Sequence, residues 1–163
     1  MINELNETKA PQYFADLSHN QRQVVEAAIE ILGDRLKKGE QLTSAEVVKD
    51  YCRLQVSAER DEQFCCIFLD NQHCMIAFER LFRGTIDGAS VHPRVVVRRS
   101  LELNAAAVIL VHNHPSGKVD PSDADIRITR RLREALGVVD VRVLDHIVVG
   151  DTGCCSLAQE GRL

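Results

Sequence analysis

Apolar residues recur at helical spacing in the first part of the chain. Ser18 and Gln21 match a capping box, the pairing that begins many helices. Six apolar positions follow at intervals of three and four residues, as in an amphipathic helix: Val24, Val25, Ala28, Ile29, Leu32 and Leu36. The pattern predicts a helix that ends near Lys38-Gly39, preceded by a loose arm.

A second capping box, Thr43 with Glu46, predicts a short helix that continues to about Leu54. Two short helices alone enclose little core. We therefore expect them to form the first layer of the following domain rather than a separate appendage.

The pattern changes to that of strands from Glu62 onward. The apolar run at 63–70 and the segment 73–82 flank a turn at Asn71-Gln72, which predicts a β-hairpin. Pro93 suits the first turn of a helix over 93–104. The run AAAVILV at 105–111 has no polar alternation, which is typical of a buried central strand.

A further helix is expected from about Asp123 to Leu136, followed by strand material at 139–150. Residues 150–153 predict a hairpin turn, and CCSL at 154–157 the returning strand. Because helices alternate with buried strands, the pattern predicts an α/β fold with an antiparallel component.

Composition narrows the class of protein. The chain has 163 residues, which suits one domain, and is 45% hydrophobic. Its formal net charge of −4 and its few aromatic residues (4%, no Trp) argue against a surface dedicated to nucleic acid. The polar opening MINELNETKA and the lack of a long apolar run predict a soluble, cytoplasmic protein with no membrane partner.

Six cysteines form no C-x-x-C motif, although two pairs are adjacent: Cys52, Cys65, Cys66, Cys74, Cys154 and Cys155. In a cytosolic chain they are expected to be reduced, half-buried strand residues. A metal-binding role is the weaker alternative.

The segment LVHNHPSGKVDPSDADI at 110–126 carries the candidate chemistry. His112 and His114 are two apart at the end of the buried strand, so their side chains should point to the same face. Asp125 follows in the first turn of a helix capped by Ser122. Two imidazoles and one carboxylate predict a zinc site with three protein ligands and an open fourth position, as in catalytic zinc centres.

Each residue also has a structural explanation. A single histidine at a strand end is often simply a hydrogen-bonded core residue. Ser122 and Asp125 also form a capping pattern, in which the carboxylate suits the positive end of the helix. The metal site is favoured because the two histidines and the carboxylate occur together at the carboxyl end of a buried strand.

The pattern H-x-H-P-x6-S-x2-D, with His112, His114, Pro115, Ser122 and Asp125 in register, resembles the signature of JAMM (MPN+) metalloproteases. The stretches FERLFRGTID, SLELNAAAVILVHNHPSG and LDHIVVGD are similar to the RadC branch. This resemblance implies one MPN (JAB/cytidine deaminase-like) domain at 42–163, a mixed curved sheet flanked by helices. Residues 1–41 would form an N-terminal arm and helix.

The resemblance also implies roles for individual residues. Glu79 stands where the family has its catalytic glutamate, which takes a proton from water activated by one Zn²⁺ per chain and passes it to the leaving amine. Ser122 would donate a hydrogen bond to the oxyanion, with the helix cap as the alternative. Glu102 is the competing glutamate, more simply explained as a solvated helix residue. Asp145 and His146 are candidates for orienting a ligand, or an ordinary pair at a strand edge.

The chain departs from its relatives in two respects. Many JAMM proteases have Ser or Thr between the histidines, where this chain and the RadC branch have Asn113. Full-length RadC relatives carry an N-terminal helix-hairpin-helix region, whose pattern we do not find in the roughly 60 residues before the first strand, so we expect a short form.

The leading hypothesis is a zinc hydrolase that cleaves a peptide or isopeptide bond of an unknown protein or peptide. The alternative is a RadC-like protein associated with DNA repair or mobile elements, with a non-proteolytic metal site. It would rest on arginines that are otherwise explained as solvated helix faces: Arg94, Arg98, Arg99, Arg127, Arg130, Arg131 and Arg133. A scaffold without activity ranks last because the ligand set is complete.

Overall fold

A computed structural model describes residues 17–37, 45–57, 59–84 and 91–163. Thr43 of the predicted capping box and residues 1–16 of the predicted arm therefore lie outside the described residues. The elements occur in the order α1 (His19–Lys37), α2 (Ala45–Val56), β1 (Gln63–Leu69), β2 (Met75–Arg83), α3 (Pro93–Glu102), β3 (Ala107–Asn113), α4 (Asp123–Gly137), β4 (Arg142–Val149) and β5 (Cys154–Ser156).

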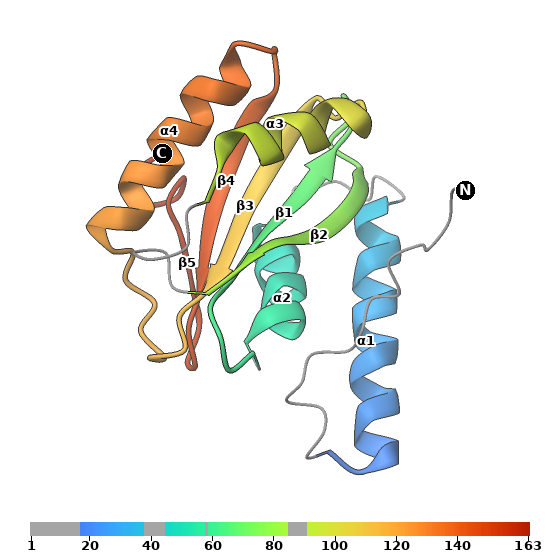
Figure 1. Ribbon diagram of the computed structural model, residues 1–163. Coiled ribbons are helices and arrows are strands. Elements are labelled where there is room, and N and C mark those ends of the chain that lie inside the picture. Colours follow the sequence, from blue (N-terminus) through green and yellow to red (C-terminus); the bar gives the residue numbers. More distant parts are fainter. Residues whose placement is uncertain (1–16, 38–44, 58, 85–90) are drawn as a thin grey trace.

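The strands form one sheet with the order β2-β1-β3-β4-β5 (Figure 1). β3 and β4 are parallel and joined through α4, whereas the other neighbouring pairs are antiparallel. β3 therefore lies at the centre, between β1 and β4. The expected α/β class with an antiparallel component is confirmed.

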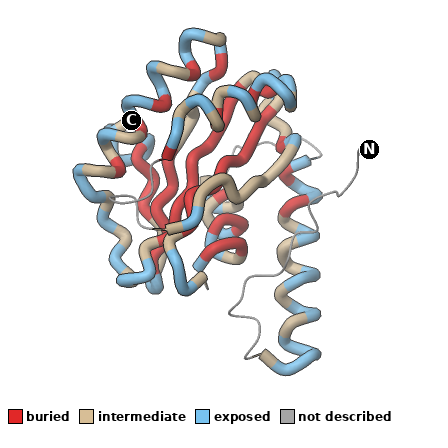
Figure 2. The backbone as a smooth tube through the Cα atoms, in the orientation of Figure 1, coloured by how far each residue is buried: buried red, intermediate tan, exposed pale blue. Residues whose placement is uncertain are grey.

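Alternation along the central strands builds a core on each face of the sheet. The central strands are accordingly buried (Figure 2). Ala107, Ile109 and Val111 of β3 pack with the cluster that includes residues of α2. Val108 and Leu110 pack on the opposite face, with α3 and α4. Every residue of β3 is buried, as the run without polar alternation predicted.

The N-terminal helix begins as the capping box predicted. The Ser18 amide and hydroxyl both donate to Gln21 Oε1, at 2.9 and 2.8 Å. Only Gly33 and Leu36 of α1 are fully buried, so the helix contacts the core mainly through its last turns. No helix within the described part of the chain is long and apolar enough to cross a membrane.

The predicted hairpin turn at Asn71-Gln72 is present, but β2 begins at Met75 rather than at His73. It is built around Asp70, whose carboxylate accepts hydrogen bonds from the amides of Gln72 and Cys74, with His73 in the left-handed region at φ 64°.

All six cysteines are free thiols, four of them buried. Cys52 lies in α2 and Cys74 in this turn, so the cysteines are not all strand residues.

Candidate metal centre

The residues of the predicted metal site meet where β3 ends and α4 begins. His112 lies in β3, His114 follows directly after the strand, and Asp125 is in the first turn of α4. His112 is fully buried, as is Asp125, whereas 15% of the His114 side chain is exposed. The strand fixes the two histidines on one face, and the helix start places the carboxylate over them.

The donor atoms are spaced as ligands of one small cation. The two Nε2 atoms of His112 and His114 are 2.9 Å apart. The Asp125 carboxylate spans both, with Oδ1 3.2 Å from His112 Nε2 and Oδ2 3.3 Å from His114 Nε2. Ligands at about 2.0–2.1 Å from a tetrahedral zinc ion are separated by roughly 3.3 Å.

A buried chain of hydrogen bonds sets the tautomer of His112. The Thr129 hydroxyl donates to the Asp125 carbonyl oxygen at 2.5 Å, so its oxygen is left to accept from His146 Nδ1 at 2.6 Å. His146 Nε2 then carries a lone pair and accepts from His112 Nδ1 at 2.8 Å. Burial lowers the pKa of His146 well below its usual range, which keeps it neutral. In the neutral imidazole of His112 the proton is therefore on Nδ1, and Nε2 carries the lone pair.

The second histidine is oriented from its own loop. His114 Nδ1 lies 2.9 Å from the Lys118 carbonyl oxygen, which can only accept, so the proton is on Nδ1 and Nε2 carries the lone pair. Gly117 closes this loop at φ 78°. An added Cβ there would lie 2.3 Å from the Asp151 carboxylate, so the tight turn requires glycine.

The site attracts positive charge. Two nitrogen lone pairs face each other and a carboxylate, and Asp125 Oδ1 is a buried atom without a hydrogen-bond partner. The neighbouring Asp125 carboxylate raises the pKa of His114, because it would accept a hydrogen bond from the protonated ring. Burial alone would raise the pKa of Asp125, but His112, His114 and Ser122 together hold it well below its usual range. Such a donor set fits a divalent cation.

Ser122 forms the helix cap that the sequence allowed as its alternative role. Its hydroxyl donates to Asp125 Oδ2 at 2.7 Å, and its oxygen accepts from the Asp125 amide at 3.2 Å. This reciprocal capping box is complete. The hydroxyl proton is thereby directed at the carboxylate and orients it toward the histidines.

A glutamate that the sequence analysis missed joins the cluster. Ligand atoms of Glu62, His112, His114 and Asp125 all lie within 4.8 Å of one another. Glu62 directly precedes β1, and β1 pairs with β3 so that Phe64 is opposite His112. Continuing this antiparallel register brings Glu62 opposite His114. Glu62 and His114 line a cleft of about 380 Å³ at the edge of the cluster.

Asn113, the residue between the histidines, holds the segment that carries Glu62. Its Oδ1 accepts from the Gln63 amide at 2.8 Å. Its Nδ2 lies 3.3 Å from the carbonyl oxygens of Glu59 and Asp61. The backbone on both sides of Glu62 is therefore fixed by one buried amide side chain.

The structure does not bring Glu79 to the cluster. Glu79 pairs with Cys66 in the β1–β2 register, level with Leu110 rather than with the histidines. Its carboxylate accepts three hydrogen bonds from Arg99, at 2.6 to 2.9 Å, and only 12% of its side chain is exposed. Glu102, the competing glutamate, pairs with Arg98 and Arg99. Both are thus committed to arginines of α3.

The two remaining candidates differ in their contacts. His146 orients His112, as described above. The Asp145 carboxylate instead accepts hydrogen bonds from the Ser156 hydroxyl and the Ala158 amide, at 2.6 and 2.9 Å, and so ties β4 to the C-terminal segment.

Comparison with known proteins shows which family the chain resembles. A family model described as a RadC-like JAB domain matches residues 42–162. A UPF0758 protein of Cellvibrio japonicus is 56% identical over 140 residues, which cover 86% of this chain and 62% of the relative. A UPF0758 protein of Vibrio cholerae serotype O1 is 49% identical over 155 residues, 95% of this chain and 98% of the relative.

A UPF0758 protein of Nitrosococcus oceani is 58% identical over 132 residues, which cover 81% of this chain and 59% of the relative. The chain thus spans about three fifths of the length of the Cellvibrio and Nitrosococcus relatives. The family match covers most of the chain and includes every residue of the metal centre. The chain therefore belongs to the RadC-like JAB-domain family, and its fold is of the JAB/MPN type.

Proposed function

We propose that the protein is a zinc-dependent hydrolase of the JAMM type that cleaves a peptide or isopeptide bond. The observation that carries the proposal is the convergence of the His112 and His114 Nε2 atoms on a buried carboxylate, beside a cleft lined by a glutamate. Three protein ligands with access from a cleft are typical of catalytic zinc sites.

His112, His114 and Asp125 would hold the ion. When bound, zinc acts as a Lewis acid and brings the ionisation of water close to neutral pH. The family resemblance alone suggests the amide bond as the target.

Glu62, in place of Glu79, is the proposed general base. Its carboxylate lies within reach of the cluster at the lining of the cleft. It would accept the proton of the attacking water and deliver it to the leaving amine. Asn113 holds the backbone around Glu62, so the point from which the carboxylate projects is fixed before a substrate arrives.

The experiment compares Glu62→Gln with Glu79→Gln. Protein purified without chelator should contain about one zinc per chain by elemental analysis, and His114→Ala should abolish it. Cleavage of a mixture of peptides and lysine isopeptides is followed by mass spectrometry. Glu62→Gln should keep the metal and lose turnover by about 100-fold or more.

Glu79→Gln is the matched control, because it replaces a carboxylate that contacts Arg99 on the same face of the sheet. Glu79→Gln should keep both metal and turnover, although the loss of its contact with Arg99 should lower the stability of the fold. Purified protein without bound metal would overturn the proposed zinc chemistry. Full turnover in Glu62→Gln would refute the role of Glu62.

A further inference from the structure

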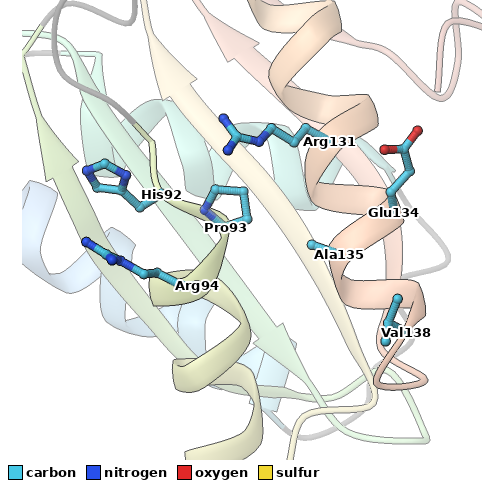
Figure 3. Close-up of a pocket in the computed structure, with 7 residues that line it drawn as sticks. All are labelled: His92, Pro93, Arg94, Arg131, Glu134, Ala135 and Val138. Carbon is cyan, nitrogen blue, oxygen red and sulfur yellow. The ribbon is translucent and has the colours of Figure 1, made fainter.

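A second cleft lies on the face of the sheet covered by α3 and α4 (Figure 3). This α3–α4 cleft has a volume of about 610 Å³ and is lined by His92, Pro93, Arg94, Arg131, Glu134, Ala135 and Val138. It contains none of the four residues of the metal cluster.

The walls of the cleft carry uncompensated positive charge. Arg94 on α3 and Arg131 on α4 are both exposed, and neither forms an ion pair with a described residue. By contrast, Arg98 and Arg99 on the same helix are paired with glutamates. In Figure 3 the carboxylate of Glu134 points away from the Arg131 guanidinium.

Arg127 extends this positive surface along α4, because it lies one turn before Arg131 on the same side of the helix and is also exposed. Together α3 and α4 carry seven arginines and four acidic residues, whereas the chain as a whole has a net charge of −4. The layer formed by the two helices is therefore more positive than the rest of the chain, which complements an acidic ligand.

The cleft also offers an apolar surface. Val138, directly after α4, is 84% exposed and lines the cleft together with Pro93 and Ala135. A nucleic-acid backbone gains little from exposed aliphatic side chains, and the cleft has no Phe, Tyr or Trp on which a base could stack. The combination favours a peptide with acidic and aliphatic side chains.

A series of ring contacts runs from His92 in the cleft to His112 in the metal centre. Phe64 stacks on His112 at 6.3 Å between ring centroids, Phe82 lies 6.2 Å from Phe64, and His92 lies 6.4 Å from Phe82. An extended chain advances about 3.3 Å per residue. In a straight line, the His92 ring of the cleft and the His112 ring of the metal centre are therefore no farther apart than about six residues of extended peptide.

We propose that the α3–α4 cleft binds an acidic, partly aliphatic segment of a polypeptide substrate while another part of that polypeptide occupies the metal centre. Occupancy of the metal centre by the same polypeptide rests on the proposed function, whereas binding in the cleft does not. Arg94 and Arg131 would contact the acidic side chains, and Val138 an aliphatic one.

The test measures binding of a fluorescein-labelled peptide of about 12 residues, built from glutamate, leucine and glycine, by fluorescence anisotropy. The same peptide with lysine in place of glutamate and a single-stranded oligonucleotide of similar length are the competing probes. The double variant Arg94→Glu/Arg131→Glu should weaken binding of the acidic peptide by about tenfold or more.

Arg53→Glu is the matched control, because Arg53 is an exposed arginine of α2 on the opposite face of the sheet. It should bind the acidic peptide like the unchanged protein. Arg94→Ala and Arg131→Ala replace the double variant if circular dichroism shows that charge reversal prevents folding. His114→Ala, which lacks the metal site, should keep acidic-peptide binding even if no hydrolysis is found.

The proposal is overturned if the acidic and lysine peptides bind equally, or if Arg53→Glu loses as much affinity as the double variant. Tighter binding of the oligonucleotide would assign the surface to nucleic acid instead. Loss of peptide binding in His114→Ala would place the peptide at the metal centre rather than in the cleft.

Discussion

At the scale of single residues, the tautomer of His112 is set from outside the metal centre. Thr129 and His146 are not among the proposed ligands, yet their hydrogen bonds direct the proton of the neutral His112 ring to Nδ1 and leave the lone pair on Nε2. Partners of this kind raise the affinity of a ligand for its metal by fixing the ring and its tautomer.

We predict that His146→Ala weakens zinc affinity by about 10- to 100-fold, because His112 loses the acceptor of its Nδ1 proton. Competition with a chelator of known affinity measures the change. His73→Asn is the control, since His73 is a turn histidine bonded to Arg142, and asparagine tolerates its left-handed backbone. Equal affinity in His146→Ala and the unchanged protein would refute the role of the chain of hydrogen bonds.

The sequence predicted one part of the site and missed another, for a physical reason. His112, His114 and Asp125 lie within one strand–loop–helix unit, where local periodicity and capping determine their placement. Glu62 reaches them only through pairing of β1 with β3, which are separated along the chain by β2 and α3. No local pattern encodes that register, and Glu79 was inferred from resemblance alone.

At the scale of elements, the start of α4 combines a helix cap with a proposed metal ligand. Ser122 and Asp125 exchange hydrogen bonds, and the same carboxylate spans both histidines. The capping pattern and the metal pattern, which the sequence presented as alternatives, are thus compatible. The cap supports the proposed metal site because its hydrogen bonds fix the direction of the Asp125 carboxylate.

Removing the cap should therefore affect stability even without metal. We predict that Ser122→Ala lowers the free energy of unfolding by about 1 kcal/mol, measured by urea denaturation in the presence of chelator. Ser122→Thr should retain most of the stability. Ser57→Ala, at an exposed position after α2, should change it by less than about 0.5 kcal/mol. A neutral Ser122→Ala would show that the cap contributes nothing to folding.

The elements themselves were largely predictable. The capping box at Ser18, proline at the start of α3 and the apolar run of β3 are local signals, and each element was found. The strand order could not be inferred, because it depends on which faces the helices cover. The ends of β3 also shifted, from 105–111 to Ala107–Asn113, since pairing with β1 and β4 extends the strand through His112.

At the scale of the whole molecule, the two cores bury thiols. Burial raises the pKa of Cys65 to about 12 and those of Cys52 and Cys66 well above their usual range. In the unfolded chain these thiols ionise near pH 8.5. Above that pH the folded protein binds more protons than the unfolded one, so stability falls as pH rises toward the folded pKa values.

We predict that the free energy of unfolding decreases between pH 8 and pH 10, with a slope that approaches about 1.4 kcal/mol per pH unit above the unfolded pKa for each thiol that stays protonated in the fold. Urea denaturation with a reductant present measures it. In the Cys52→Ala and Cys66→Ala variants the slope against pH should be shallower, whatever their stability at neutral pH. An unchanged slope would assign the alkaline loss to other groups.

The chain of hydrogen bonds from His112 through His146 and Thr129 returns to the backbone of Asp125. Two ligands from different elements are thus joined by the protein itself, independently of any ion. Their orientational entropy is lost when the domain folds and not when a metal arrives. The centre is therefore preorganised, so that metal can be removed and restored at equilibrium with little change in the fold around it.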